Sequence, residues 1–578
     1  MTRARPAGGH ERPVNPLLYN DVVGPDVVDP ACSEHIPVST LMHHRALPVC
    51  RTTDGVLVLT ALDAAEPSPI EDWFPGEALR YHRVASGLVQ ELIVAARTDE
   101  VADEMANGLA RRRPDLSART GVAGWQKTAA WAFVVGAVVT LVAGGAPLIA
   151  TMAGVLFVAG MLFKLVMAIA SARPPVTTPP RQLTDEELPS YTILVPAYQE
   201  EAVIGETVRC IANLDYPNDK LEVLVLVERR DEATARAVRD VDPPDYVRIV
   251  TLPPGRPQTK PRSCNLGLML ARGDLLVIYD AEDRPDRDQL RKAASQFAAG
   301  GPGLACVQAR LNFYNARRNL LTRMFALEFA YWFDLMLVGL DRLRLPIPLG
   351  GTSNHLRTDV LRDIGGWDAW NVTEDADIGV RLAAAGHRVE VVDSTTWEEC
   401  PSRPWAWTRQ RTRWLKGYLL TLLVHTRSPL AATRRFGVAG MVTLVGLVGG
   451  TPVSALLWPL AFALPFAGAA GADPGRWWVV SAYASSGAMW IVVGLTAVAM
   501  MVAGRRRGSG WTLAALLPCY LLMHAVAAWR GLLQLVRDPY GWEKTTHHEG
   551  APNRLTTTAV PSRSWSTPRI STDMDAGR

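Results

Sequence analysis

The stretch VIYDAEDRP, residues 277–285, places three carboxylates within four positions directly after a run of apolar residues. Like charges this close repel one another, so a metal ion, a basic side chain or the water around an exposed turn must accompany them. The run DLLVIYD (274–280) that leads into the cluster has the apolar, β-rich character of a buried strand. The carboxylates are therefore expected at the end of a strand.

Three earlier runs carry the same strand signal: YTILVPAY (191–198), LEVLVLV (221–227) and VRIVTL (247–252). Helical patterns follow the first two, over about 201–212 and 232–241. Strands that alternate with helices predict a parallel sheet with helices on both faces. Ligands bind such sheets at the carboxyl ends of the strands, which is where the quoted carboxylates fall.

The composition of the chain indicates a membrane protein. Its 578 residues are 48% hydrophobic, which is high for a purely soluble protein. The formal net charge is +3 and the basic residues are spread along the chain, so nucleic acid is not expected as a partner. The seven cysteines are scattered without a CxxC or metal-ligand spacing, as in proteins whose reduced thiols face a cytosol.

Two apolar blocks are predicted to lie in the membrane. No secretory signal is visible in the first thirty residues, so insertion is expected to rely on internal segments. Residues 128–171 are almost wholly apolar around a Gly/Pro turn and predict a transmembrane hairpin. The block 437–537 predicts three or four spans, with an interfacial helix over 529–537. A single span over 437–468 would put Arg505–Arg507 on the side of the middle domain, whereas two would put the tail there.

Outside these blocks the chain divides into two folded domains and two polar ends. Residues 182–426 have the size of one soluble domain and hold the strands described above. Residues 35–116 carry one strand-like and one helix-like run, which predict a small soluble domain on the same side of the membrane. Residues 1–34 and 551–578 are predicted to be disordered because they contain little apolar sequence.

Charged residues follow two of the predicted strands. Asp280, Glu282 and Asp283 suit a divalent cation bound with a nucleotide diphosphate, because hard cations such as Mg²⁺ or Mn²⁺ take carboxylate oxygens. A solvated acidic turn ahead of a helix explains them equally well. After the third strand, Lys260 and Arg262 could bind phosphates, although solvated loop charges are the commoner explanation of such a pair.

A second acidic pair begins a predicted helix. Thr373 suits its N-cap, Glu374 and Asp375 its first turn, and Gly386 its end. Capping does not explain the long apolar, glycine-rich approach over 346–372, which suggests a binding wall. A carboxylate held in such a wall could accept a proton from an acceptor hydroxyl.

The motif QRTRW forms one face of another predicted helix. Gln410, Arg413 and Trp414 lie at positions i, i+3 and i+4. That face offers an arginine for a diphosphate and a flat ring on which a sugar can stack. A basic amphipathic helix resting on lipid headgroups explains the same residues, and the two interpretations are compatible.

Taken in order, VPAYQEE, KPRSCNLGL, YDAEDRPD, LGGTSNHLRTDVLRDIGGWD, TEDADIGVRL and QRTRW resemble the membrane-embedded family-2 glycosyltransferases, the group of cellulose, chitin and hyaluronan synthases. The resemblance covers about 191–418. It implies an α/β GT-A (Rossmann-like) catalytic domain between transmembrane helix blocks, and it leaves the small amino-terminal α/β domain outside the matched motifs.

The resemblance also implies roles for individual residues. Asp375 would be the catalytic base, with Glu374 beside it. The motif DAED stands where the synthases have DxD, so either Glu282 or Asp283 could be the metal ligand, with Asp283 preferred. Glu228 occupies the position of the acidic residue that holds the nucleotide base, although VERRDE replaces a more acidic stretch there. The expected donor-binding residues are Glu228, Lys260, Asp280, Gln410, Arg413 and Trp414.

The function implied is an inverting glycosyltransferase that uses Mg²⁺ or Mn²⁺. It would move a sugar from a UDP-sugar to a growing polysaccharide or glycan at the cytosolic face of the inner (plasma) membrane, in contact with membrane lipids. One alternative is transfer of a single sugar to a lipid or small acceptor. Another is a non-catalytic nucleotide-binding envelope receptor or assembly protein.

The carboxyl-terminal WEKTTHH (542–548) is similar to that of a bacterial subgroup with a soluble first domain. That first domain resembles one at the start of type II secretion ATPases, a suspected cyclic-di-GMP sensor. Residues 35–116 contain no convincing copy of its ligand motif, so a cyclic dinucleotide partner is a hypothesis only.

Overall fold

The computed structural model describes residues 28–53, 55–62, 68–173, 180–467, 477–508 and 510–543. The predicted disordered tail and residues 544–548 lie outside them. The predicted disordered N-terminus overlaps them, and there the structure differs from the prediction. The backbone N–H of Asp29 donates to the carbonyl of Val49 (2.7 Å), and Val28 and Cys32 are buried. The folded chain therefore includes residue 28.

Eight strands form the sheet of the central domain, which we define as residues 182–426. They are β4 (Tyr191–Ala197), β5 (Leu221–Glu228), β6 (Val247–Leu252), β7 (Leu275–Ile278), β8 (Arg284–Pro285), β9 (Leu304–Phe313), β10 (Asn354–Arg357) and β11 (Arg388–Glu398). Their order is β6-β5-β4-β7-β10-β9-β11-β8. The first four run parallel, as predicted, whereas β10 runs antiparallel to both of its neighbours and makes the sheet mixed.

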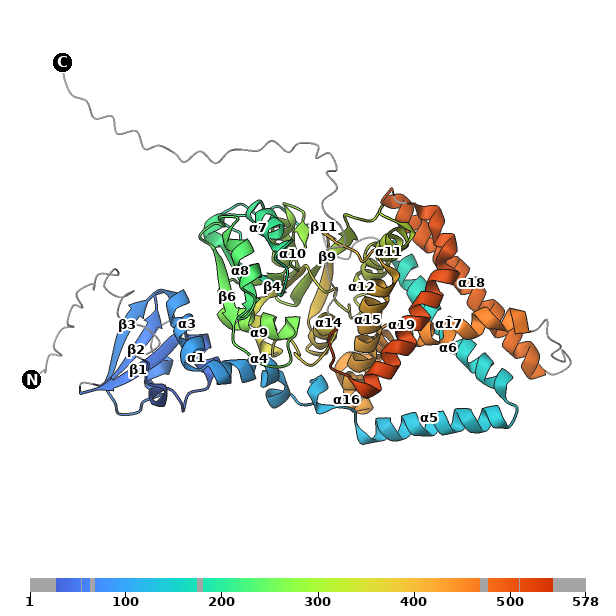
Figure 1. Cartoon of the computed structure of the whole chain (residues 1–578), viewed down its shortest axis with the longest axis horizontal. Helices are drawn as coiled ribbons and strands as arrows, with labels where there is room; N and C mark the ends of the chain where they lie inside the picture. Colours follow the sequence, from blue (N-terminus) through green and yellow to red (C-terminus); the bar gives the residue numbers. More distant parts are fainter. Residues whose placement is uncertain are drawn as a thin grey trace, which may run out of the picture.

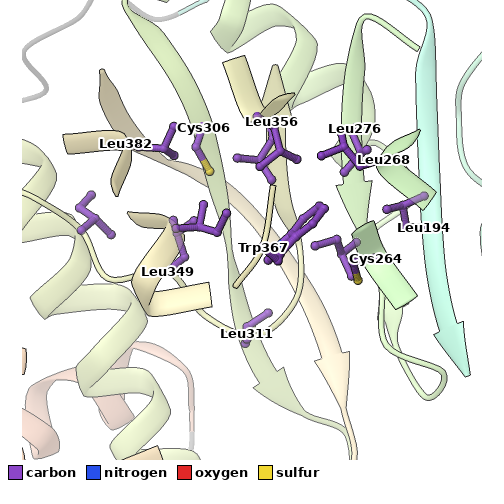
Figure 2. Close-up of a cluster of buried hydrophobic side chains, with 14 of the residues drawn as sticks. Leu194, Cys264, Leu268, Leu276, Cys306, Leu311, Leu349, Leu356, Trp367 and Leu382 are labelled. Atoms are coloured by element: carbon purple, nitrogen blue, oxygen red, sulfur yellow. The ribbon is translucent and has the colours of Figure 1, made fainter. Parts of the chain in front are cut away.

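Helices cover both faces of this sheet because its strands are apolar on both sides. Within β4, Ile193 and Leu194 belong to different core clusters. Figure 2 shows Leu194, Leu276 and Leu356 of the strands among other buried apolar side chains, with Trp367 in the same cluster. The covering helices are α7 (Ile204–Ala212), α8 (Glu232–Arg239), α9 (Lys260–Leu270), α10 (Gln289–Gly300), α13 (Thr358–Asp363) and α14 (Glu374–Ala384).

The small domain holds a three-stranded sheet and several helices. Its elements are η3 (Pro30–Cys32), α1 (Val38–His44), β1 (Ala46–Thr52), β2 (Gly55–Ala61), α2 (Ser68–Glu71), β3 (Leu79–Val84), α3 (Ser86–Ala96) and α4 (Thr98–Arg112). β2 lies between the other two strands. The single helix-like run of the sequence is two helices, which separate at Arg97.

The small domain docks directly onto the central domain through α4, next to α9 (Figure 1). The side-chain amide of Asn265 donates to the carbonyl of Met105 (2.8 Å), and the indole of Trp370 donates to that of Ala106 (3.0 Å). The guanidinium of Arg427 then binds the connecting segment, donating to the carbonyls of residues 117 and 121. The two domains are therefore joined by hydrogen bonds as well as by the chain.

Five described helices are long and apolar enough to cross a membrane, over 124–142, 146–170, 429–460, 479–506 and 511–537. Helices α6, α17 and α18 pack together at the end of the molecule opposite the small domain (Figure 1). The elements of these segments are α5 (Gly124–Val142), α6 (Ala146–Ala170), α16 (Pro429–Thr443), η7 (Leu444–Gly449), α17 (Gly450–Ala467), α18 (Trp477–Arg506), η9 (Trp511–Leu516) and α19 (Leu517–Arg537).

Helical structure is continuous from Val438 to Ala467, so this part of the sequence forms one span-length segment rather than two. Its start is set by Gly437, whose φ of +64° interrupts α16. The segment 529–537, predicted as a separate interfacial helix, is the last part of α19. No proline interrupts α19 there, and glycine alone does not end a helix that packs against a neighbour.

Helix α15 (Pro404–His425) lies beside α19 along most of its length. The indole N–H of Trp407 donates to the hydroxyl of Tyr520 (3.1 Å), and Lys416 donates to the carbonyl of Gly541 (2.8 Å). The chain beyond α19 therefore returns to the central domain. Between β9 and β10 lie α11 (Leu320–Ala330), η6 (Tyr331–Met336) and α12 (Leu337–Arg342), which pack against the membrane helices.

Candidate active site

A cavity of about 480 Å³ opens at the carboxyl ends of the parallel strands. Nine of the ten residues that the sequence singles out line it, although they come from five separate parts of the chain. They are Glu228, Lys260, Asp280, Glu282, Glu374, Asp375, Gln410, Arg413 and Trp414. The tenth, Asp283, does not line the cavity. The edge of the sheet predicted to hold a ligand is thus the edge at which the cavity lies.

Lys260 is the basic side chain that contacts the carboxylate cluster after β7. Its ammonium donates to Asp280 Oδ1 and to the carbonyl of Gly351 (2.5 Å). Burial alone would lower the pKa of Lys260, but the charges of Asp280 and Glu374 raise it above its usual value. Lys260 stays protonated and offsets part of the repulsion. It was expected to bind phosphate, and here it already binds groups of the protein.

Arg262 is also engaged within the protein. It is fully buried, lies 3.4 Å from a carboxylate oxygen of Glu228 and donates to the carbonyl of Pro253. Burial raises the pKa of Glu228, with Arg262 acting in the opposite direction. Glu228 nevertheless lines the cavity, so its carboxylate is positioned at the end of β5 with one cationic neighbour.

Asp283 lies beneath the cavity rather than at its wall. Its Oδ2 accepts from the backbone N–H of Asp280 (2.7 Å) and from the hydroxyl of Thr352, which closes the turn after β7. Its Oδ1 has no partner among the described residues. Burial, followed by the charges of Asp280 and Glu282, raises its pKa well above the usual value. Glu282, the residue just before Asp283 in the same turn, reaches the cavity instead.

Glu398 is a fourth carboxylate of this cluster that the sequence analysis did not identify. It ends β11 and lines the cavity, and its Oε1 has no partner in the described part of the chain. Burial and the charges of Asp283, Asp280 and Glu282 raise its pKa well above the usual value. The pairing of β11 with β8, Thr396 opposite Pro285, brings it beside the DAED turn.

The carboxylate cluster has the chemistry of a divalent-cation site. Carboxylate oxygens are the donors that Mg²⁺ and Mn²⁺ prefer, and the unpartnered oxygens of Asp283 and Glu398 are buried among like charges. A cation would relieve this repulsion. Within the described ranges, no three Asp, Glu, His or Cys side chains are already gathered around one point. The residues fit the cation in donor type and charge, and a bound ion would have to draw them together.

Asp375 stands in the first turn of α14 and faces the cavity. Thr373 occupies the N-cap position without a side-chain cap hydrogen bond, so the expected capping role is not seen. Asp375 Oδ1 accepts from the N–H of Ala376 (2.7 Å), and a Cβ at Gly351 would lie 3.2 Å from Oδ2. Burial raises the pKa of Asp375, and burial with the charge of Asp375 raises that of Glu374 to about 8. A carboxylate with a raised pKa is a stronger proton acceptor once ionised.

An ion pair beneath Asp375 fixes the start of α14. Arg381 donates to Asp377 Oδ2 (2.7 Å) and to two backbone carbonyls of the preceding loop. His425, at the end of α15, lies 2.8 Å from Asp377 Oδ1. All three side chains are at most 1% exposed. They tie the acidic helix to the helix that carries QRTRW.

The predicted shared face of α15 is present, since Gln410, Arg413 and Trp414 all line the cavity. Buried polar atoms of Gln410 and Arg413 have no partner among the described residues and remain available to a ligand. The guanidinium of Arg413 lies 4.3 Å from the ring centre of Trp542, beyond α19. Trp542 was not expected in the site, because the 127 residues 415–541 separate it from QRTRW.

Neighbouring side chains already cover part of the Trp414 ring. The guanidinium of Arg411 lies 4.6 Å from its ring centre, and the ring of Phe329 stacks against it at 6.2 Å. What the ring offers the cavity is therefore the part that these neighbours leave uncovered.

Under the glycosyltransferase function that the sequence resemblance implies, we expect Trp414→Ala to lower sugar transfer about tenfold, because an indole contact worth about 1.4 kcal/mol is lost. Membrane insertion and binding of the expected donor nucleotide should stay near wild type. Trp405→Ala on the same helix is the matched control, since Trp405 is exposed. Equal transfer rates in the two variants, measured with purified protein, would favour a lipid-surface role for Trp414 instead.

Comparison with known proteins relates the central domain to a family of glycosyltransferases. Residues 189–417 match the family described as "Glycosyltransferase like family 2". A probable glycosyltransferase of Bacillus subtilis, YdaM, is 29% identical over 239 residues, 40% of this chain and 56% of that protein. Beta-monoglucosyldiacylglycerol synthase of Synechocystis is 28% identical over 262 residues, 44% of this chain and 52% of that protein. A solved mannosyltransferase from Pyrobaculum calidifontis, in complex with GDP-Man and Mn²⁺, aligns at 22% identity over 66% of this chain and 98% of that one, with a TM-score of 0.45.

The chain thus spans about half the length of the curated relatives it matches. With the strand order, the family match confirms the predicted GT-A-like α/β fold, and residues 189–417 of the central domain match a family of glycosyltransferases. The match does not reach residues 35–116. It gives no support to the resemblance of that domain to type II secretion ATPases or to a cyclic dinucleotide there.

Proposed function

We propose that this chain, whose central domain is a family 2 glycosyltransferase domain, transfers a sugar from a UDP-sugar to a growing polysaccharide or glycan. The transfer inverts the anomeric carbon and takes place at the cytosolic face of the membrane. One observation carries the proposal: Asp375, the acidic turn after β7 and the QRTRW face line a single cavity. A proton acceptor, a cation-attracting cluster and a diphosphate-binding arginine therefore meet where one donor and one acceptor can bind together.

The residues divide the reaction among them. Glu228 would hold the nucleotide base. Gln410 and Arg413, each with one buried polar atom that has no partner among the described residues, would bind the diphosphate. Asp375 would take the proton of the acceptor hydroxyl as its oxygen attacks the anomeric carbon and the bond to UDP breaks. Because the attack and the departure occur on opposite faces, a single displacement inverts that carbon. The charge of Glu374 helps to keep Lys260 protonated beside Asp280.

Glu282, Asp283 and Glu398 would hold a divalent cation, either Mg²⁺ or Mn²⁺. When bound, it would supply positive charge that stabilises the departing diphosphate. Asp280 is shared between this cluster and Lys260.

We expect excess chelator to lower turnover at least about tenfold, with recovery on addition of Mg²⁺ or Mn²⁺. UDP release by the purified chain measures this. Full turnover in chelator would contradict the assignment of the carboxylate cluster, whatever the sugar.

The contacts of the C-terminal segment support four spans rather than five. Trp542 lies over Arg413 in the cavity, and Glu543 pairs with Arg530 and Arg409. If α19 crossed the membrane, these residues would be on the opposite side from the central domain. We therefore assign α19 to the membrane surface and the spans to α5, α6, the segment 438–467 and α18.

This topology also agrees with the distribution of positive charge. Arg507 directly follows α18 and pairs with Asp334 of η6, so this end of α18 lies against the central domain. Positive residues at span ends favour the cytosolic side, which supports a cytosolic position for the central and small domains.

Transfer of one sugar to a lipid or small acceptor is the second candidate. It is favoured by the cavity itself, whose walls continue from the sheet edge to residues of α6, α17 and α18. Product length separates the two candidates, because a polymer-forming enzyme yields a ladder and a single transfer yields one species.

The test of the proposal is UDP release by the chain in nanodiscs, screened across nucleotide sugars and followed by linkage analysis of the product. We expect turnover with at least one UDP-sugar. A chain that binds nucleotide but never turns it over would instead be the non-catalytic receptor considered above.

A further inference from the structure

The inner end of the cavity lies at the level of the membrane helices and has a different character from the outer end. Its wall includes apolar side chains such as Phe157, Met161 and Met500. Apart from Glu328, every carboxylate that lines the cavity belongs to the sheet edge or to α14. The two ends therefore attract different ligands.

Lys164 of α6 places a cation in this inner end. It lines the cavity, and in the part of the chain that the structure describes its ammonium has no hydrogen bond or ion pair. It lies six residues before the end of α6, which is about 9 Å into the span. A charged residue at such a depth that faces protein rather than lipid is a functional-site candidate.

Glu328 is the carboxylate whose charge acts on Lys164, and it already has partners within the protein. Glu328 accepts hydrogen bonds from Arg411 (2.6 Å) and Tyr520 (2.8 Å), and His524 lies 3.3 Å away. Burial alone would raise the pKa of Glu328, but Arg411 and His524 lower it to about 2. Because Glu328 is paired with Arg411, Lys164 has no carboxylate of its own among the described residues.

Two hydroxyl groups add hydrogen-bonding capacity at the same end. Ser454 of α17 is 4% exposed and Tyr331 of η6 is 6% exposed, and both line the cavity. Neither hydroxyl has a partner among the described residues. Buried polar groups are rarely left unpaired, so these two, like the ammonium, point to a ligand. Tyr331 also begins a π-helical turn, a feature frequent at functional sites.

We propose that Lys164, Ser454 and Tyr331 bind the anionic head of a membrane amphiphile, a phosphate on a lipid. A phosphate supplies the negative charge that Lys164 lacks and accepts from both hydroxyls. The apolar wall suits the lipid chains, and the depth of Lys164 matches the boundary between headgroups and acyl chains. The phosphate belongs either to the lipid that accepts the sugar or to a resident phospholipid. The first case rests on the proposed function, whereas the second does not.

The experiment measures lipid binding without any donor. The full chain in a neutral maltoside detergent is mixed with dioleoyl phosphatidic acid or with dioleoylglycerol, which differ only in the phosphate, and bound lipid is counted by native mass spectrometry. We expect the wild type to prefer phosphatidic acid about tenfold, as one charge-assisted contact would provide. Lys164→Met should lose this preference, Lys164→Arg should keep it, and Ser454→Ala should reduce it.

Lys127→Met is the matched control, because it makes the same change at an exposed position of another membrane helix. It should leave the preference intact. Equal binding of the two lipids by the wild type, or an unchanged preference in a folded Lys164→Met variant, overturns the proposal.

A second measurement identifies the source of the phosphate. Incubation with a labelled UDP-sugar and phosphatidic acid puts label on the lipid if the bound amphiphile is an acceptor. Retained binding without label indicates a resident phospholipid. A chain that shows the lipid preference yet releases no UDP refutes the proposed function alone, and one that releases UDP without the preference refutes only this inference.

Discussion

Asp375→Asn is expected to lower turnover of the UDP-sugar by about two to four orders of magnitude, because asparagine cannot take the proton of the acceptor. The change keeps the volume of the side chain and an oxygen for the N–H of Ala376, so expression, membrane insertion and UDP binding should stay near wild type. Steady-state UDP release and UDP affinity, measured on the same preparation, check both parts of this expectation.

The chain offers a close control for this variant. Asp359 is also the second residue of a helix and also accepts from the next backbone N–H, at 2.7 Å, but it is exposed and lies outside the cavity. Asp359→Asn should turn over normally. If Asp375→Asn does so too, within a few-fold, then Asp375 only begins a helix and the proposed mechanism is wrong.

The pH profile gives an independent check on the same residue. Burial raises the pKa of Asp375, so its carboxyl group gains a proton, and ceases to be a base, at a higher pH than an exposed aspartate does. Turnover should therefore fall on the acid side with a midpoint above about 4, the usual value for aspartate. A wild-type profile that is flat down to that value would contradict the role of Asp375.

Asp377→Ala is expected to destabilise the central domain by about 3 to 5 kcal/mol, because it leaves the buried guanidinium of Arg381 without its carboxylate. In a domain of this size that corresponds to a fall in Tm of about 6 to 20 °C. Thermal unfolding in detergent, followed by tryptophan fluorescence, measures it. The double variant Asp377→Ala with Arg381→Met should recover much of the loss, since it removes the orphaned charge.

The pH dependence of this contribution has a definite sign. Burial would raise the pKa of Asp377, but Arg381 and His425 hold it below its usual value. The folded state therefore favours the ionised form, and the stabilisation is present above about pH 4 and lost as the pH falls further. The Tm difference between wild type and Asp377→Ala should shrink over that range. A constant difference, or a single variant that melts like wild type, would show that the pair contributes little.

Local sequence patterns were sufficient to predict the parallel half of the sheet. Its strands are mostly apolar runs that alternate with helices along the chain, so the pattern predicts both the elements and their direction. The mixed half could not be predicted in this way. β10 is only four residues long, and its antiparallel pairing with β7 and β9 joins residues that are 46 to 82 positions apart in the chain.

The sequence predicted those site residues that belong to one local motif. It missed the residues that are brought to the site by the pairing of strands distant in the sequence. Gln410, Arg413 and Trp414 share a face because helical spacing requires it. Glu398 joins the acidic cluster only through the pairing of β11 with β8, and its own neighbourhood looks like any strand end. In the sequence, the only indication of this carboxylate is that Glu398 and Glu399 follow a strand-like run rich in valine and threonine.

Lys164 was missed for a different reason. A single lysine in a long apolar stretch does not change the prediction of a span, and the sequence does not say which way the side chain faces. Likewise, the order of residues within DAED could not tell that Glu282 reaches the cavity while Asp283 closes the turn beneath it.

The joint between the small domain and the central domain has a consequence for biosynthesis. The indole of Trp370 donates to the carbonyl of Ala106 in α4, 264 residues earlier in the chain. At ribosomal rates of about 5 to 20 residues per second, the first partner waits roughly 13 to 53 s for the second. During that time the sequence of α5 and α6 has been made while the surface that the small domain will cover is incomplete. The nascent protein must therefore pass through a stage in which its first domain is tethered but undocked, and that stage is where chaperones and proteases can act on it.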